Sequence, residues 1–216
     1  MNTLTKLALG MLGQLRPKPA AAGGGPRIVL PPPRTAGGLP LMQALQRRES
    51  RRSFAPQPLD PQDLSDLLWA AAGINRPELG GRTAPSALNA QEVSLHAAMA
   101  DGLYRYLPAE HALERSADTD VRAVTGYQDF VDTAPLDLVY VADLSAASMV
   151  PVAQREAYAQ VAAGAMAQNV YLFCASAGLA TVIRAWLDRA ALARAMQLHG
   201  DQVVLLAQTV GRPGAG

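Results

Sequence analysis

One long helical stretch, residues 153–177, constrains this chain more than any other feature of its sequence. It contains no proline, and it ends at Gly178, a residue typical of the position just past a helix. Several of its side chains are small enough to let a neighbouring backbone approach closely: Ala162, Gly164, Ala165 and Ala167. The sequence therefore predicts a long, close-packed helix, which could lie in the core of a single subunit.

Two more helices are predicted near the start of the domain. The first, Leu39 to Arg48, has one apolar face formed by Leu41, Met42 and Leu45. The second, residues 59–73, has clear boundary signals. We expect Asp60 to be its N-cap, Pro61 its first helical residue and Gly73 its C′ residue. Trp69 in this helix is interpreted as a core residue.

Strand patterns dominate the middle and the end of the chain. The predicted strands are 92–99, 103–107, 136–143 and 202–210, with Asp101-Gly102 as a hairpin turn between the first two. The segment LATVI (179–183) leads from the long helix to Arg184. Helices are also predicted at 115–130 and at 189–197, the latter capped by Asp188. These strands are too few for a barrel, so we expect an α+β, two-layer architecture in which helices flank a mixed central sheet. No G-x-G-x-x-G opens a helix after a strand, which argues against a dinucleotide-binding Rossmann site.

The totals describe one ordinary globular domain. At 216 residues the chain is long enough to bury roughly 70% of its unfolded surface. A net charge of +1 and a hydrophobic content of 50% are unremarkable, and no run approaches the ~20 apolar residues of a membrane span. The single Cys174 excludes an internal disulfide. Lysine occurs only at Lys6 and Lys18, so a catalytic lysine in the domain is not expected.

Residues 1–27 are interpreted as an N-terminal tail, and 28–216 as the folded domain. The tail carries a short apolar run after Lys6 followed by small residues, a pattern shared with signal peptides. Arg16 and Lys18 are charges in the region where such a peptide would be cleaved. We expect a cytoplasmic protein, with export as the alternative if residues 1–22 are a signal peptide; a flexible arm is the other interpretation.

The most informative stretch for function is RRESRRSF, residues 47–54. In an extended segment residues two apart point the same way, so Arg48, Ser50 and Arg52 would converge on one point. Guanidinium groups match phosphate oxygens, and a serine hydroxyl adds a neutral donor. From charge alone a solvated basic loop is an equal or better explanation. A nucleic-acid surface is disfavoured because the rest of the chain is not basic.

A second candidate site lies in the loop from Arg82 to Gln91. Its small residues, Pro85, Ser86 and Ala87, would let a flat ring approach the backbone, and Asn89 offers both a donor and an acceptor. A polar turn without function is the competing interpretation. His96 and His111 stand apart from other metal-ligand types, so we interpret both as structural or surface residues and expect no metal site.

Five pieces in order give the chain a family resemblance: RRESRRSF, RTAPSALNAQ (82–91), GYQDFVDTAP (126–135), GAMAQNVYLFCASAGLATV (164–182) and the terminal VGRPGAG. The chain resembles the nitroreductase-like FMN-dependent oxidoreductases. It resembles most closely the branch that contains the azoline-oxidising dehydrogenases of peptide maturation. The likeness runs from about Ile28 to the end. It implies the nitroreductase-like fold, with the long helix at the centre of a homodimer.

The resemblance also implies roles for particular residues. Arg48, Ser50 and Arg52 would hold the FMN phosphate, supported by Arg47, and Arg212 would add another fork. The ring would be contacted by Pro85, Ser86, Ala87 and Asn89 of the second subunit, by Gln128, and by the backbone at Ala185 and Trp186. Relatives usually have a small residue where this chain has Trp186, so the indole would narrow the substrate face. Many relatives carry a further basic residue beyond Arg212, a contact that this chain lacks.

The implied function is an FMN-dependent oxidoreductase that works by a ping-pong cycle. NADH or NADPH would be the donor, and a quinone or nitroaromatic compound the acceptor. The flavin carries such chemistry, which agrees with the lack of a Ser-His-Asp set or paired carboxylates in the sequence.

Three alternatives stay open. An azoline-type peptide dehydrogenase would need a Lys-Tyr pair, and no lysine follows Lys18. A flavin-binding protein without turnover and a purely structural module are the other two.

Overall fold

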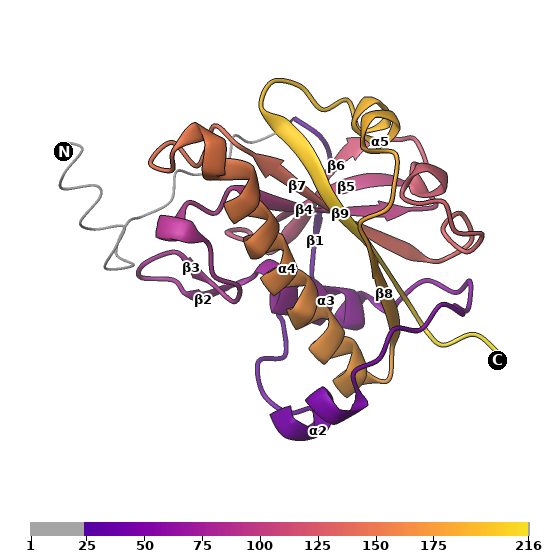
Figure 1. The fold of residues 1–216 in the computed structure, drawn as a ribbon. Helices are drawn as coiled ribbons and strands as arrows, with labels where there is room; N and C mark the ends of the chain where they lie inside the picture. The colour runs from indigo at the N-terminus through magenta and orange to yellow at the C-terminus, as the bar shows by residue number, and fades with distance from the viewer. Residues whose placement is uncertain (1–23, 216) are drawn as a thin grey trace.

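The computed structural model describes residues 24–215, which form an α+β structure around a seven-stranded sheet (Figure 1). The strands follow the order β1-β6-β5-β4-β7-β9-β8. Five of them are β1 (Arg27–Val29), β4 (Val93–Met99), β5 (Gly102–Leu107), β6 (Ala112–Ala117) and β7 (Leu136–Asp143). The others are β8 (Ala180–Arg184) and β9 (Gln202–Gly211), and a separate two-stranded sheet pairs β2 (Ile74–Arg76) with β3 (Gly81–Arg82).

Four α-helices and two short 3₁₀ helices complete the described part of the chain. They are α2 (Leu41–Arg47), α3 (Pro61–Ala72), η1 (Ala87–Asn89), η2 (Arg122–Val124), α4 (Val152–Ala177) and α5 (Arg189–Ala195). The α+β architecture and the flanking helices are confirmed. Residues 1–23 of the predicted tail (1–27) lie outside the described range. Arg27, the last residue assigned to that tail, belongs to β1. The signal-peptide question falls on residues 1–22, outside the described range.

The sheet was expected to be mixed, and this detail was wrong for the described strands: every neighbouring pair is antiparallel. The reason lies in the order of the last strands. β7 and β8 are joined through α4 and run parallel to each other, as a helical crossover requires. β9 then inserts between them and pairs antiparallel with both.

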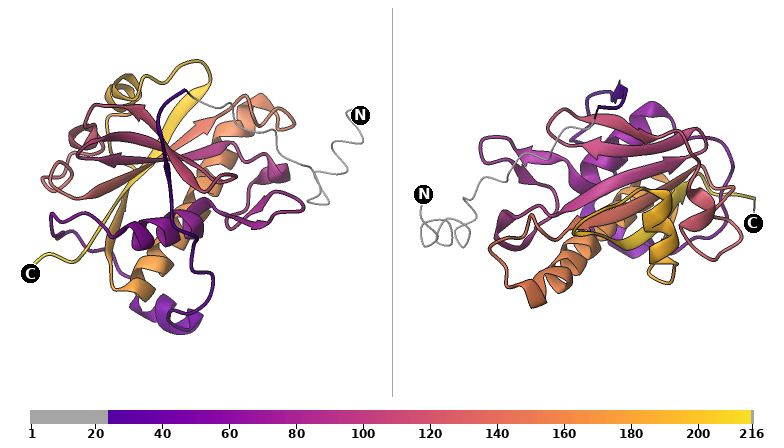
Figure 2. Two further views of the ribbon diagram at one scale, coloured as in Figure 1. Left: turned by 180° about the vertical axis from the view of Figure 1, so that it is seen from behind. Right: turned by 90° about the horizontal axis from the view of Figure 1, so that it is seen from above.

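The long helix is confirmed, and α4 crosses one face of the sheet, as the two views of Figure 2 show. It ends where predicted, because Gly178 adopts a left-handed conformation with φ of 71° and its N–H donates to the Cys174 carbonyl. Leu68 of α3 and Val170 of α4 are buried against this face of the sheet together with Leu138 and Tyr140 of β7. α3 and α4 therefore share the larger core.

The opposite face of the sheet has a smaller core. Leu192 of α5 is buried there against Val139 of β7 and Val204 of β9. Alternate residues of β7 thus point into two different cores, which confirms that this apolar run is a central strand. Asp188 caps α5 as predicted, accepting a hydrogen bond from the Ala191 N–H at 2.9 Å.

The helix predicted at 115–130 is absent. Residues 112–117 form β6, which pairs with β5, and only the short η2 follows. The residues ALERSAD have helical propensity, but β5 would otherwise be left without a partner on this side. Pairing along the strand decided the conformation, as tertiary context commonly does.

Both ends of α3 differ from expectation in detail. Asp60 occupies the N-cap position but makes no capping hydrogen bond, because its carboxylate forms an ion pair with Arg212 instead. Gly73 is the C-cap with φ of −67° rather than a left-handed C′ residue. Trp69 is half-buried, and its indole N–H donates to the Ile74 carbonyl at 3.3 Å.

Among the helices between residues 24 and 215, none has the length and apolar character that a bilayer-spanning segment needs.

A buried ion pair ties the last three strands together. Arg184 of β8 donates to Asp137 of β7 at 2.8 Å, and both side chains are at most 3% exposed. Thr209 of β9 hydrogen-bonds both partners, and Thr125 donates to the second carboxylate oxygen at 2.9 Å. The Arg184 guanidinium also lies 5.5 Å from the centre of the Phe130 ring. The pair is therefore almost fully surrounded by partners.

We predict that Asp137→Asn lowers the free energy of unfolding by about 3–5 kcal/mol, because it leaves the Arg184 charge buried without a counterion. Urea unfolding followed by circular dichroism measures the loss. Asp118→Asn is the control, since Asp118 is 85% exposed where it pairs with Arg115, and the urea midpoint should hardly move. Equal midpoints for the two variants would contradict the prediction.

Candidate functional site

The arginine-rich segment leaves α2 as extended chain and runs beside β8. α2 ends at Arg47, and Arg48 takes an extended ψ of 119°. The Arg51 N–H then donates to the Thr181 carbonyl at 3.0 Å, on the edge of β8 that β9 does not cover. This contact holds the segment against the outer edge of the sheet.

Side chains alternate along the segment as an extended chain requires. Arg48 and Ser50 both reach Tyr171 of α4: the guanidinium carbon lies 5.4 Å from the ring centre, and Ser50 Oγ lies 2.7 Å from the phenol oxygen. The Tyr171 oxygen also accepts the Ile183 N–H of β8 at 3.1 Å. Sequence reasoning missed Tyr171, because nothing in its local pattern distinguishes it from other helical residues.

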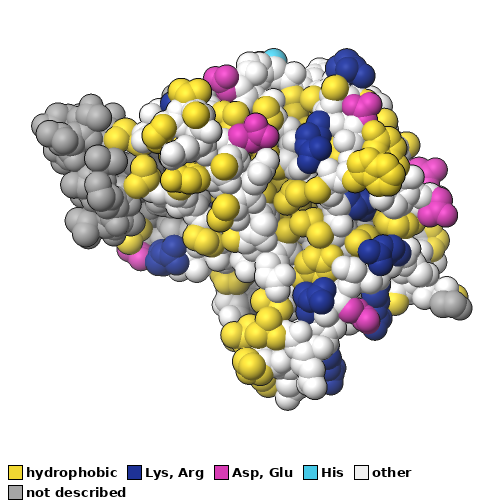
Figure 3. Space-filling view, viewed as in Figure 1, with side chains coloured by type: hydrophobic (Ala, Val, Ile, Leu, Met, Phe, Trp, Pro, Cys, Tyr) yellow, Lys and Arg dark blue, Asp and Glu magenta, His cyan; other side chains and the backbone are white. Residues whose placement is uncertain are grey.

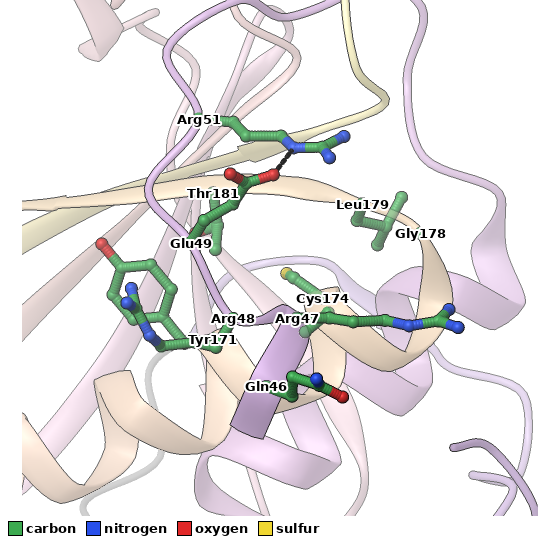
Figure 4. A pocket seen from close by; sticks show the side chains of 11 residues that line it. Gln46, Arg47, Arg48, Glu49, Arg51, Tyr171, Cys174, Gly178, Leu179 and Thr181 are labelled. Carbon is green, nitrogen blue, oxygen red and sulfur yellow. Dashed lines mark hydrogen bonds and ion pairs between the residues drawn. The ribbon is translucent and has the colours of Figure 1, made fainter. Parts of the chain in front are cut away.

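A cavity of about 420 Å³ opens beside the segment, at the C-terminal end of α4 (Figure 4). Residues of α2 and of the segment line one side, and residues of α4 and β8 line the other: Gln46, Arg47, Arg48, Glu49, Arg51, Tyr171, Cys174, Ala175, Gly178, Leu179 and Thr181. Glu49 pairs with Arg51 at 2.6 Å. Burial raises the pKa of the Cys174 thiol, so this cysteine is a neutral wall residue rather than a nucleophile.

The charge at this cavity is unbalanced. Within residues 24–215 no carboxylate pairs with Arg47, Arg48 or Arg52, so only Arg51 of the four neighbouring arginines has an acidic partner. Clustered guanidinium groups repel one another unless an anion lies among them. The arrangement is therefore suited to an anion with several acceptor oxygens, such as a phosphate monoester.

Three residues predicted to hold the phosphate are not among those that line the cavity: Ser50, Arg52 and Arg212. Arg52 is exposed and is not among the lining residues. Arg212 lies next to the segment through its backbone, since its carbonyl accepts the Ala55 N–H at 2.9 Å. Its guanidinium, however, pairs with Asp60 and, at 3.5 Å, with Asp63 at the start of α3. The structure thus brings Arg48 and Ser50 together at Tyr171. The Arg47 side chain extends to the other side of the cavity, toward Gly178 (Figure 4), and Arg212 is not part of it. Arg47, Arg48 and Ser50 are called the fork below.

The loop from Arg82 to Gln91 is held by its own hydrogen bonds. Ser86 Oγ accepts the Gln91 N–H at 2.9 Å, and the Gln91 amide donates to Asn89 at 3.0 Å. Leu88, Asn89 and Gln91 all have φ near +53°, a conformation that costs about 1–2 kcal/mol for most residues. Ala87 begins the short η1 helix in this loop. Such strain often occurs at functional sites.

The loop and the arginine fork lie at different levels of α4. Pro85 and Ser86 border a small hollow with Ala162 and Met166, whereas the fork faces Tyr171 and Cys174. With a rise of about 1.5 Å per residue, Ala162 and Cys174 are about 18 Å apart along the helix axis. Within one subunit these two groups of predicted residues therefore do not form one pocket.

The remaining predicted residues gather where β8 ends. Gln128 has a buried side-chain oxygen without a hydrogen-bond partner among the described residues, and the same is true of the Arg184 Nε. Ala185 and Trp186 follow β8 directly. The Trp186 indole is 76% exposed and lies 5.3 Å, centre to centre, from the ring of Tyr127. Tyr127 is the second residue here that the sequence analysis did not name.

Neither of the two histidines considered above belongs to a metal site. Burial lowers the pKa of His96 to about 3, so its imidazole is neutral, and Ser94 Oγ lies 3.1 Å from its Nε2. His111 contacts Ser65 and Tyr106. Across residues 24–215 no group of three potential metal ligands occurs.

Comparison with known proteins identifies the family. The model of the family described as "Nitroreductase family" matches residues 45–212. A protein of Methanocaldococcus jannaschii, named "Putative nitroreductase MJ1384", is 32% identical over 152 residues, which cover 66% of this chain and 76% of the relative.

Solved structures agree with the family match. The crystal structure of a protein of Ralstonia eutropha JMP134, described as "a putative nitroreductase", has a TM-score of 0.85 and 48% identity, and the match covers 94% of this chain and 96% of that one. The "NADPH:FMN oxidoreductase" of Vibrio harveyi, solved with NAD⁺, has a TM-score of 0.61 and 19% identity, covering 81% and 69%. At that identity the likeness concerns the fold. From the family match and the shared fold, the chain belongs to the nitroreductase family and is an oxidoreductase of the flavin-dependent kind.

Proposed function

We propose that this protein binds FMN and uses it to pass electrons from NADH or NADPH to a small acceptor of the quinone or nitroaromatic class. The observation that carries the proposal is that Arg48 and Ser50 meet at Tyr171. Arg47 and Arg48 also line the cavity, and neither pairs with a carboxylate within the described chain. A mononucleotide phosphate supplies the missing negative charge. Arg52 would join the fork from its exposed position.

The residues at the end of β8 suit the other end of FMN. The unpartnered Gln128 oxygen can accept a hydrogen bond from a ring N–H. We place the backbone of Ala185 and Trp186 against the reactive edge of the ring, where a main-chain N–H can donate. When bound, FMN supplies the hydride chemistry, and the chain supplies binding, orientation and tuning. The donor binds first and leaves before the acceptor enters, a ping-pong cycle.

We also propose that the working unit is a homodimer. The loop residues Pro85, Ser86, Ala87 and Asn89 lie too far along α4 to meet the fork of their own subunit, so a second copy must bring them to it. α4 and α2 carry exposed apolar side chains, and Figure 3 shows such side chains spread over this face. They are Leu41, Met42 and Leu45 of α2 and Val152, Tyr158 and Val161 of α4.

Two other functions compete with this proposal. A flavin carrier or sensor without turnover has the same phosphate fork, and it would hold FMN stoichiometrically without being reduced by either nicotinamide. An azoline-type peptide dehydrogenase would leave small acceptors unreduced. The described domain contains no lysine to form the pair that such enzymes use, which favours small acceptors.

The first prediction concerns the fork. Arg48→Ala should weaken FMN binding about 10- to 150-fold, because one charge-assisted contact contributes about 1.5–3 kcal/mol. Quenching of flavin fluorescence measures the affinity, and the yellow colour of the purified protein gives an independent check. Arg194→Ala, an exposed arginine on α5, is the control and should bind FMN normally. A colourless wild type that ignores added FMN would overturn the proposed function.

The second prediction concerns the dimer. A Cβ at Gly164 meets no atom within 4 Å in the isolated chain, so Gly164→Trp should fold normally as a monomer. If α4 packs against a second copy, the indole blocks that contact. Light scattering should then show a dimer for the wild type and for the control Gly164→Ala, and a monomer for Gly164→Trp. The same mass for all three proteins would argue against an interface at this face.

The third prediction concerns acceptor size. Trp186→Gly should raise kcat/KM for bulky quinones relative to small ones, because it removes the exposed indole from the mouth of the proposed ring site. Steady-state rates with a series of quinones of increasing width measure the effect. Trp69→Phe is the control, because it removes the other indole of the chain, which belongs to α3 and not to the end of β8. Unchanged ratios across the series would refute a role for Trp186 in selecting the acceptor.

A further inference from the structure

Tyr171 makes two hydrogen bonds through its phenol oxygen, and the geometry determines the direction of one of them. Its phenol oxygen must accept from Ile183, since a backbone N–H can only donate, at 3.1 Å. The phenol proton is then free to point to its second neighbour, Ser50 Oγ, at 2.7 Å. The phenol can thus donate to Ser50 while it accepts from Ile183, and this is the direction that we assign to the 2.7 Å contact.

This direction has a consequence for Ser50. A serine hydroxyl that accepts from a phenol keeps its own proton available for another acceptor. Ser50 lies on the exposed side of the segment, between Arg48 and Arg52. The proton can therefore point outward to an anion bound beside the Arg48 guanidinium. Each donor in such a series polarises the next, which strengthens the last hydrogen bond.

The same ring also restrains Arg48. The guanidinium carbon lies 5.4 Å from the centre of the Tyr171 ring, within the range of a cation–π contact. A free arginine side chain loses up to about 2 kcal/mol of conformational entropy when it is fixed by a ligand. Stacking on Tyr171 limits that freedom before the ligand arrives. Tyr171 thus restrains both Arg48 and Ser50 before a ligand binds.

We propose that Tyr171 is a positioning residue for phosphate recognition, which relays the Ile183 N–H through its hydroxyl to orient Ser50 and holds Arg48 against its ring. The inference rests on the proposed function, because the anion is the FMN phosphate. It goes beyond that function by assigning the positioning of Arg48 and Ser50 to a buried helix residue in the cavity wall. The Ile183 N–H also connects Tyr171, at the proposed phosphate site, to β8. β8 is followed by Ala185 and Trp186, which we place against the flavin ring.

The test compares two ligands that differ only in phosphate. FMN and riboflavin are titrated into apo-protein while flavin fluorescence is followed. Tyr171→Phe keeps the ring and removes the hydroxyl, so FMN should bind about 3- to 10-fold more weakly, as expected for one hydrogen bond. Riboflavin should bind as it does to the wild type. Tyr171→Leu also removes the ring and should weaken FMN binding further.

A double-mutant cycle separates relay from general packing. If Tyr171 acts through Ser50, Tyr171→Phe should have no further effect on FMN affinity in a Ser50→Ala background. Additive losses would overturn the relay, and so would an equal loss of riboflavin affinity in Tyr171→Phe. Thermal denaturation confirms that each variant is folded, and Ser50→Ala alone tests the fork if Tyr171→Phe does not fold.

These outcomes are distinct from failure of the proposed function. A wild type that binds neither flavin would reject FMN binding itself. A wild type that binds FMN, with Tyr171→Phe binding it equally well, would reject only the role of Tyr171.

Discussion

The turn at Gly178 is the constraint on which the rest of the site depends. α4 packs across the sheet and must reverse direction to continue as β8, and the left-handed Gly178 makes that reversal within one residue. The reversal lays the last turns of α4 beside the outer edge of β8. Tyr171 can then accept the Ile183 N–H, and the arginine segment can attach to Thr181. A sheet edge that would otherwise be open becomes the floor of the candidate site.

Charge is distributed unevenly over this scaffold. Two arginines that tie distant segments together have carboxylate partners: Arg184 with Asp137 in the interior, and Arg212 with Asp60 at the start of α3. Arg47 and Arg48 have none within residues 24–215, although they lie beside a cavity. Unpaired guanidinium groups held by α2 and by the Tyr171 ring lose little freedom on meeting an anion. The absence of a carboxylate partner within the described chain therefore distinguishes Arg47 and Arg48 from Arg184 and Arg212.

Long-range geometry also underlies the proposed homodimer. The strained loop 82–91 and the fork lie along one straight helix, and a straight helix cannot fold back to bring them together. A two-fold pairing through α4 would place the loop of each copy beside the fork of the other. The exposed apolar residues of α2 and α4 are the surfaces that such a pairing would cover.

Local features could be predicted from the residue pattern alone. The boundaries of α4, β4 and β7, the cap at Asp188 and the alternation of Arg48 and Ser50 follow from periodicity and terminal residues, which act over a few positions. Tertiary structure decided what depends on partners distant in the chain. Residues 112–117 form β6 despite their helical propensity, because they pair with β5. Asp60 forms an ion pair with Arg212 instead of a capping hydrogen bond. Tyr171 hydrogen-bonds Ser50, which lies 121 positions away in the chain. Such contacts leave no trace in local pattern, because each partner is chosen by the fold as a whole.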